Sequence, residues 1–159
     1  ESFRPFAPSI LRGSLSNYFN LNCDSPYMLL VASVNDKIKK EMNDKEKQLF
    51  GIEKLNVVRS NIPAVTHVDY SSRIQTVDKN TNEKFYNLIN HFNNKTNCPL
   101  LVNTSFNIRG EPIVNTVEDA FKCFMGTGLD TLVIGNFILR KNKQNLKFDK
   151  EYKDKYNLD

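Results

Sequence analysis

Three short clusters of polar and cationic residues interrupt apolar segments of this sequence. Arg4 lies in FRPFAPSIL, between apolar residues and beside two prolines. THVDYSSR (66–73) places His67 and Arg73 at the junction of two apolar segments. NTSFNIRGE (103–111) follows directly on the apolar run CPLLV. A plain surface loop requires only turn residues, so these clusters are the places to look for chemistry.

The residue types in these clusters suit an anionic ligand. Arg offers a planar fork of donors that matches phosphate or carboxylate oxygens, and Arg4 and Arg73 could both take that role. Asn103 and Ser105 add amide and hydroxyl groups, and the N–H groups of a loop can form an anion-binding nest. Gly110 permits a close approach of the backbone. The sequence therefore predicts a binding site for a phosphorylated small molecule.

Each of these residues also has a purely structural interpretation. Arg4 could pair with a core carboxylate, and Asn103 and Ser105 could be turn residues. His67 lies between Thr and Val, which favours a structural histidine over a metal ligand, and HxxxH and HExxH are absent. A nucleophilic Ser105 is disfavoured because G-x-S-x-G is absent. The phosphate-binding patterns GxxxxGK[ST] and GxGxxG are also absent.

Apolar runs bounded by turn residues predict the strands that would position these clusters. FRPFAPSIL contains two prolines, so it is expected to be extended, edge-like or irregular. SPYMLLVASV (25–34) is predicted to be a buried strand. The remaining predicted strands are IPAVTHVDY and SRIQTV around a turn at 69–72, CPLLVNTSF (98–106), and a final strand DTLVIGNFIL (130–139).

Helical periodicity marks three further segments. Residues 35–61 are rich in Lys and Glu and predict an amphipathic surface helix that Gly51 ends. NEKFYNLINHFNNKTN (82–97) has Phe85, Leu88, Ile89 and Phe92 on one face. Thr116 is expected to cap a helix that closes at Gly126 and Gly128, with Asp119 completing a capping box. The charged tail 140–159 is expected to be peripheral, helical or frayed.

Composition fits one soluble domain of mixed α/β (α+β) class. The 159 residues are 40% hydrophobic and 25% charged. The odd number of cysteines, Cys23, Cys98 and Cys123, without C-x-x-C, predicts neither a disulfide framework nor a zinc site and suggests a cytoplasmic setting.

The net charge is +4, of which the tail provides +3, from seven Lys/Arg and four Asp/Glu. A near-neutral body argues against general nucleic-acid binding.

Five motifs occur in a fixed order along the chain: FRPFAPSIL, SPYMLL, IPAVTHVDYSSRIQTV, NTSFNIRGEPIV and EDAFKCFMGTGLDTLVIGNFIL. Together they resemble the C-terminal domain of the nodulation- and antibiotic-type O-carbamoyltransferases. The resemblance covers most of the chain, from residue 3 to about residue 139. It implies a YrdC-like fold, which is a twisted open mixed β-sheet with flanking helices.

The resemblance also implies a function. The domain would bind carbamoyl phosphate and ATP, with Mg²⁺ accompanying the ATP, and would form carbamoyl-adenylate. A larger N-terminal, Kae1-like domain of actin-like ATPase fold, which holds Fe²⁺, would pass the carbamoyl group to an acceptor hydroxyl. The chain begins with Glu1, which agrees with a single domain (1–159) cut from such a protein, inactive alone and without a metal site of its own.

The site residues follow by the same resemblance. Carbamoyl phosphate would be bound by Arg4, Arg73, Asn103 and Ser105, with Arg73 and Ser105 in catalytic roles. Candidates for ATP contacts or loop support are Asn107, Arg109 and His67, and Arg109 could instead pair with Glu111. The family usually has Gly after His-Val-Asp, where this chain has Tyr70.

Two alternative functions stay open. One is synthesis of threonylcarbamoyl-adenylate, although the series RPFAPS, NTSFN and GEPIV favours the O-carbamoyltransferases. The other is a non-catalytic RNA-binding module, suggested by the basic tail. A homodimer is a further expectation, and no membrane partner is expected because no apolar run approaches the length of a span.

Overall fold

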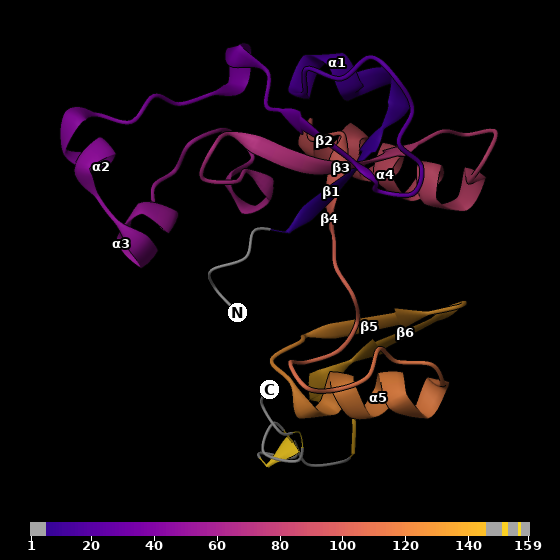
Figure 1. Ribbon diagram of the computed structural model, residues 1–159. Coiled ribbons are helices and arrows are strands. Elements are labelled where there is room, and N and C mark those ends of the chain that lie inside the picture. The colour runs from indigo at the N-terminus through magenta and orange to yellow at the C-terminus, as the bar shows by residue number, and fades with distance from the viewer. Residues whose placement is uncertain (1–5, 146–150, 153–155, 157–159) are drawn as a thin grey trace. The chain divides into compact units, whose positions relative to one another are not determined.

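The computed structural model describes residues 6–145, 151–152 and 156, in two compact units, Glu1–Thr104 and Ser105–Asp159 (Figure 1). In the described part of the chain, no helix has the length and apolar character needed to cross a membrane.

The first unit is built on a mixed four-stranded sheet. Its strands are β1 (Ala7–Leu11), β2 (Leu30–Ser33), β3 (Ser71–Val77) and β4 (Leu100–Asn103), in the order β2-β3-β1-β4. β1 and β3 run parallel, and the other two pairs are antiparallel. The predicted mixed α/β class, with a mixed sheet and flanking helices, is confirmed.

β1 is extended, as one of the expected alternatives had it, but it is central and wholly buried, so the edge-like and irregular alternatives are wrong. The proline that motivated it, Pro8, lies where it costs no hydrogen bond. Leu11 N–H donates toward β4, to Pro99 O at 3.0 Å. Alternate residues of a strand direct their N–H groups to opposite edges, so Pro8 N faces β3 instead. The pairing with β3 begins only at Ser9, one residue later, and a proline is tolerated at such a position.

The two faces of this sheet are covered by different elements. One face packs Ile10, Ile74 and Leu100 against α1 (Leu15–Tyr18), the 3₁₀ turn η3 (Pro63–Val65) and neighbouring apolar side chains. On the other face, Leu11 and Val77 pack against α4 (Glu83–Thr96). Figure 1 shows α4 lying beside the sheet. Alternation of side chains along β1 and β3 produces this division.

The predicted helix over 82–97 is confirmed as α4. Asn82 caps its first turn by accepting from Phe85 N–H, and Asn97 ends it with a left-handed φ of 57°. Of the predicted apolar stripe, Ile89 is fully buried, but Leu88 is 57% exposed. The apolar stripe of α4 is therefore wider than its contact with the sheet.

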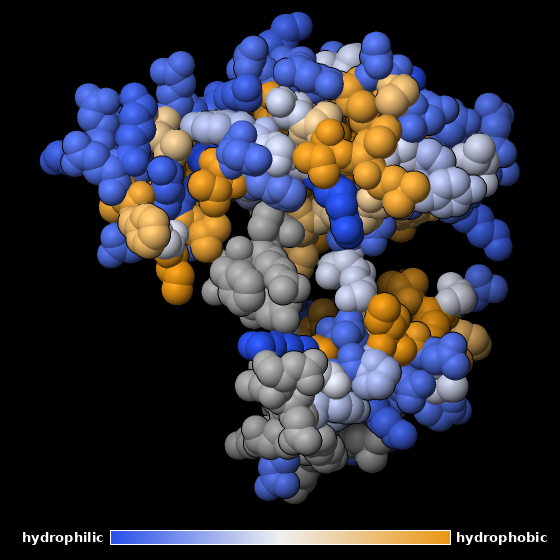
Figure 2. Space-filling view, in the orientation of Figure 1, coloured by the Kyte–Doolittle hydropathy of each residue, from blue (hydrophilic) through white to orange (hydrophobic). Residues whose placement is uncertain are grey.

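The predicted long helix in residues 35–61 is wrong. The segment contains the 3₁₀ turn η2 (Asp36–Ile38) and two short helices, α2 (Asp44–Gln48) and α3 (Gly51–Leu55). Asn43 starts α2 with a capping box, and Gly51, with φ of +58°, begins α3 instead of ending a helix. Figure 2 shows mainly hydrophilic side chains over α2, as expected of a solvated excursion.

Two predicted strands also differ from the structure. β2 is an edge strand with Val31 58% exposed, so the segment 25–34 is not a buried strand. IPAVTHVDY forms η3 and a turn, because Pro63 starts a 3₁₀ turn there. SRIQTV is confirmed as the body of β3, and CPLLVNTSF as the segment that contains β4.

The second unit consists of α5 (Val117–Gly126), the hairpin β5 (Thr131–Ile134) and β6 (Phe137–Arg140), and the 3₁₀ turn η4 (Lys141–Lys143). The predicted capping box of Thr116 and Asp119 is present. The predicted single final strand is wrong, because Gly135 takes φ of +56° and turns the chain back. Figure 2 shows apolar side chains over this hairpin, where Phe137 and Ile138 are exposed.

The core of the second unit includes part of the tail. Ala120, Phe124 and Leu132 form its apolar centre. Tyr152 is only 5% exposed, which differs from the expectation of a peripheral tail. Most other tail residues after 145 lie outside the described part of the chain. The predictions for Arg4 likewise fall outside the described residues.

Candidate functional site

The face of the sheet that α4 covers is apolar at one end and polar at the other. Beneath α4 lie Leu11, Val77 and Leu101. Side chains two residues apart on a strand lie on the same face. Moving two residues along each strand, away from α4, leads from Leu11 to Ser9, from Val77 to Gln75 and, in the antiparallel β4, from Leu101 to Asn103. Arg73 follows on this face, two residues before Gln75. Sequence alternation thus places four polar side chains side by side on three neighbouring strands.

Three of these side chains form a closed hydrogen-bond network. Ser9 Oγ donates to Gln75 Oε1 at 2.6 Å. Asn103 Nδ2 donates to Gln75 Oε1 at 2.8 Å and to Ser9 Oγ at 3.1 Å. Ser9 is completely buried, and Gln75 and Asn103 are half-buried. Both donors of the Asn103 amide are therefore engaged within the protein.

A backbone carbonyl fixes the direction of this network. Gln75 Nε2 donates to Pro26 O at 3.0 Å. A carbonyl can only accept, so the NH₂ group of Gln75 must face Pro26 and its Oε1 must face Ser9 and Asn103. Asn103 must then present its own NH₂ group to Gln75. Among the described residues nothing donates to Asn103 Oδ1, so this oxygen can accept a further hydrogen bond.

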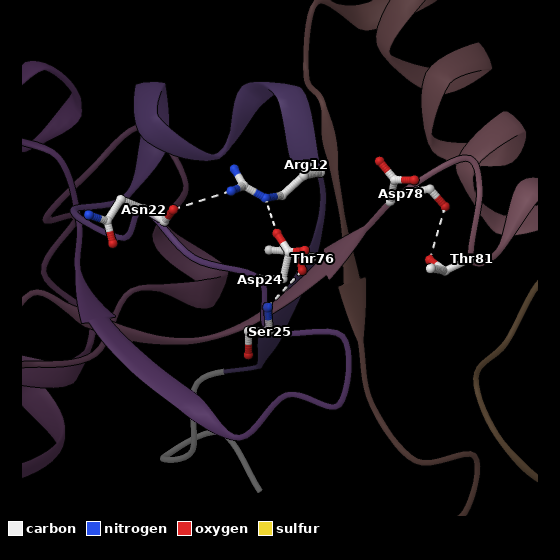
Figure 3. Close-up of polar contacts among 7 residues, drawn as sticks. All are labelled: Arg12, Asn22, Asp24, Ser25, Thr76, Asp78 and Thr81. Carbon is white, nitrogen blue, oxygen red and sulfur yellow. Dashed lines mark hydrogen bonds and ion pairs between the residues drawn. The ribbon is translucent and has the colours of Figure 1, made fainter.

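The loop that contains Pro26 is anchored to β3 by Ser25. Ser25 N–H donates to Thr76 Oγ1 at 2.8 Å, Ser25 Oγ–H to Ile74 O at 2.8 Å, and Thr76 N–H to Ser25 O at 3.0 Å. Figure 3 shows Ser25 facing Thr76, with Asp24 beside it paired to Arg12. These contacts hold Pro26 O at a constant place beside Gln75.

Arg73 is exposed on β3, and its Nη2 lies 3.3 Å from Met28 Sδ. No carboxylate pairs with it in the part of the chain that the structure describes. On β4, Asn103 lies opposite Ala7. On β3, Gln75 lies opposite Ser9, and the same register continued by two residues places Arg73 opposite Ala7. Ala7 therefore lies between Arg73 and Asn103. The Cα atoms of Arg73 and Asn103 are thus separated by two inter-strand spacings, roughly 10 Å, with a small side chain between them.

His67 lies in the turn that leads into β3. Its Nδ1 is 3.0 Å from Ser71 Oγ, and its backbone N–H donates to Ser71 O at 2.8 Å. Hydrogen bonds from Ser71 hold the pKa of Asp69 below its usual value. Tyr70 takes the left-handed φ of 62°, the conformation that a glycine adopts most readily. The resemblance implies Gly at this position, and Tyr70 takes a conformation that Gly would also take.

In the second unit, the part of the NTSFNIRGE loop from Ser105 onward is closed on itself. Asn107 Nδ2 donates to Glu111 O at 2.7 Å and to Ile108 O at 3.2 Å. Gly110 takes φ of +80°, which suits the tight turn. Arg109 and Ser105 are exposed. Asn107 thus braces the loop through backbone carbonyls.

Glu111 is buried below this loop and is fully bound. Its Oε2 accepts from Ile108 N–H at 2.8 Å, and its Oε1 accepts from Tyr152 Oη and, at 3.3 Å, from Tyr156 Oη. Burial and the charge of Glu111 raise the pKa of the nearby Cys123 to about 11. Burial and the hydrogen bond to Glu111 also raise the pKa of Tyr152. The carboxylate joins the loop to the C-terminal segment.

Of the predicted site, Asn103 and Arg73 lie on one face of the first unit's sheet. Ser105, Asn107 and Arg109 belong to the second unit, and Arg4 lies outside the described residues. Sequence reasoning missed Ser9 and Gln75. The alternation in SRIQTV, which puts Gln75 on the face of Arg73, was the available signal. The described residues contain no group of three or more His, Cys, Asp and Glu side chains that could hold a metal ion.

Comparison with known proteins shows the family to which this chain belongs. The family model described as "Carbamoyltransferase C-terminus" matches residues 1–141. An uncharacterized protein of Synechocystis is 52% identical over 100% of this chain and 26% of its own length. Nodulation protein NolO of Bradyrhizobium diazoefficiens is 40% identical over 92% of the chain and 24% of its own length. The 3'-hydroxymethylcephem-O-carbamoyltransferase of Amycolatopsis lactamdurans is 29% identical over 86% and 22% respectively. The chain spans about a quarter of the length of these relatives.

Proposed function

The chain belongs to the carbamoyltransferase C-terminal family, as its five motifs predicted, and from this membership we propose that it binds carbamoyl phosphate and ATP for an O-carbamoyltransferase. The product of this domain is carbamoyl-adenylate. The acceptor hydroxyl is reached in another part of the protein.

The observation that supports this proposal is the polar end of the sheet face in the first unit. Arg73 is an exposed guanidinium that no described carboxylate neutralises, so its fork of donors is available to phosphate oxygens. Asn103 Oδ1, two strands away, is available to an N–H donor. Carbamoyl phosphate has an anionic phosphate at one end and an amide NH₂ at the other. The two groups match the two ends of the ligand.

The reaction requires positioning and charge neutralisation more than a general base. Water releases phosphate from carbamoyl phosphate and leaves carbamate. A carbamate oxygen then attacks the α-phosphorus of ATP, and pyrophosphate leaves with its bonding electrons. Arg73 binds the anionic oxygens of carbamoyl phosphate. Mg²⁺ enters with ATP and is bound by its phosphates and by water.

The rest of the pathway lies in a larger protein in this proposal. A Kae1-like N-terminal domain with Fe²⁺ passes the carbamoyl group to the acceptor hydroxyl. One of the relatives is a 3'-hydroxymethylcephem-O-carbamoyltransferase, and the chain covers about a quarter of it. This is the reason to assign the adenylate-forming step, and not the whole transfer, to the present chain.

Threonylcarbamoyl-adenylate synthesis is the competing function. Its substrates would be threonine, bicarbonate and ATP, and it would not require carbamoyl phosphate. The family match favours the carbamoyltransferase reaction over this one.

Exchange of labelled pyrophosphate into ATP tests the proposal in the intact natural protein. Exchange should occur only when carbamoyl phosphate is present. Exchange that requires threonine and bicarbonate would assign the competing function instead. Absence of exchange with either set of substrates would refute an adenylate-forming role.

A further inference from the structure

We propose that Gln75 is a positioning residue that makes the site selective for a carbamoyl group over an acyl group of the same shape. It does so by fixing which end of the Asn103 amide meets the ligand. This inference rests on the proposed function, because it concerns the same ligand.

The orientation of Asn103 is set by a chain of donors and acceptors with only one consistent solution. Pro26 O accepts from Gln75 Nε2 at 3.0 Å. Gln75 therefore offers an acceptor, Oε1, to Asn103 Nδ2 at 2.8 Å. Rotating the Asn103 amide by 180° would place two oxygens against each other and would break this bond. The ligand side of Asn103 is thereby an acceptor.

Ser9 closes the network but cannot fix its direction alone. A hydroxyl can donate or accept as its hydrogen rotates. Its Oγ here donates to Gln75 Oε1 at 2.6 Å and accepts from Asn103 at 3.1 Å. With Gln75 absent, the same hydroxyl could serve either orientation of Asn103. The anchored carbonyl of Pro26 is thus the origin of the direction, and Gln75 transmits it.

The consequence is a preference for an N–H donor at one end of the ligand. Carbamoyl phosphate and acetyl phosphate have the same shape, but one ends in NH₂ and the other in CH₃. An acceptor that a ligand covers without offering it a donor costs binding free energy, so a site built to bind an NH group rejects the methyl analogue. The phosphate end of the two ligands is identical, and Arg73 binds it in either case.

Binding of the two ligands to the intact protein, measured by calorimetry, tests this inference. The wild-type protein should bind carbamoyl phosphate about tenfold or more tightly than acetyl phosphate, the effect of one well-placed hydrogen bond. Gln75→Met removes the acceptor and should reduce the ratio of the two dissociation constants to about twofold or less. Inorganic phosphate should bind this variant as it binds the wild type, because Arg73 is unchanged.

A conservative variant separates orientation from simple structural support. Gln75→Glu keeps an oxygen toward Asn103 Nδ2, so the preference ratio should persist even though the added charge weakens both ligands. Gln48→Met, at the exposed end of α2, is the matched control and should leave the ratio at its wild-type value. If Gln75→Met does not fold, Gln75→Leu gives the same comparison, because Leu also lacks the acceptor.

The outcomes distinguish this inference from the proposed function. An unchanged ratio in the folded Gln75→Met variant would overturn the role of Gln75 while leaving the anion site intact. Equal binding of both ligands by the wild type would have the same meaning. Failure of the wild type to bind either phosphate would overturn the proposed function itself.

Discussion

Neighbouring residues decide which hydrogen-bonding atoms of a polar side chain remain available in this chain. Asn103 illustrates this. Its sequence context, an amide directly after a buried strand, predicts an amide that could both donate and accept. In the structure both donors are engaged by Ser9 and Gln75, so only Oδ1 remains. Residue type identified the candidate, and the neighbouring strands determined which of its atoms is available.

Tyr70 has an unusual backbone conformation and a distant hydrogen-bond partner. The resemblance implies glycine at this position, so the tyrosine raises the question of a different turn. The chain adopts the left-handed conformation there nonetheless, and Tyr70 Oη donates to Lys40 O at 3.1 Å. A contact 30 residues away in the sequence thus accompanies a backbone conformation that a tyrosine rarely adopts. Local sequence could not predict that contact.

The thiol of Cys123 gives a prediction about pH. Its pKa is raised from 9.0 to about 11 in the folded protein, by burial first and then by Glu111. The unfolded chain loses the proton at lower pH than the folded one, so the free energy of unfolding should fall as pH rises from 9.0 to about 11. Cys123→Ala should flatten this slope in chemical denaturation measured across that range.

Thiol labelling provides an independent check on Cys123. At pH 8 the exposed Cys23 should react rapidly with an aromatic disulfide reagent, while Cys123, buried and protonated, should react only as the protein unfolds. Equal rates for the two thiols would contradict the buried environment of Cys123.

At the scale of elements, the loop before β2 depends on Ser25. Its hydroxyl is buried and donates to Ile74 O at 2.8 Å. Ser25→Ala should lower the free energy of unfolding by about 1–2 kcal/mol, because a buried hydrogen bond is lost. Urea denaturation measures this, with the exposed Ser16→Ala as the control that should change stability by less than about 0.5 kcal/mol. No difference between the two variants would show that the loop is held by other contacts.

The end of α5 is shaped by a close approach of Tyr152 to Gly126. A Cβ added to Gly126 would lie 2.1 Å from Cγ of the Tyr152 ring, whereas one added to Gly128 would meet nothing within 4 Å. Gly126→Ala should therefore displace the C-terminal segment and destabilise the protein by about 1–3 kcal/mol, with faster proteolysis of that segment. Gly128→Ala should leave the proteolysis rate near that of the wild type. Equal rates for the two variants would contradict the packing of Tyr152.

How much of the element structure the sequence predicts depends on whether the deciding contacts are local. α4 was predicted from its apolar stripe and α5 from its cap at Thr116, and both signals act within a few residues of the chain. β1 was not predicted as a central strand. Pro8 is tolerated in it only because the pairing with β3 starts one residue later, at Ser9, and that register is not a local feature of the sequence. The hairpin turn at Gly135 was missed, although a Gly-Asn pair between apolar runs is a local signal for it.

At the scale of the whole molecule, the family was predictable and the complete site was not. Five ordered motifs identify a carbamoyltransferase C-terminal domain, and the family match over residues 1–141 agrees. The residues proposed to bind carbamoyl phosphate come from segments far apart in the chain. The register of three strands brings Arg73 and Asn103 to one face of the sheet. This register cannot be predicted from the sequence.

The central claim is that Arg73 binds the phosphate of the substrate from which carbamoyl-adenylate is made. Exchange of labelled pyrophosphate into ATP, dependent on carbamoyl phosphate, tests it most directly when Arg73→Ala is compared with Arg140→Ala in the intact protein. Arg140 is an exposed arginine of β6 outside the proposed site. We predict that Arg73→Ala lowers the exchange rate at least about 100-fold, the scale expected when a charged transition-state contact is removed, and that Arg140→Ala stays within about twofold of the wild type. Full exchange by a folded Arg73→Ala variant would contradict the account.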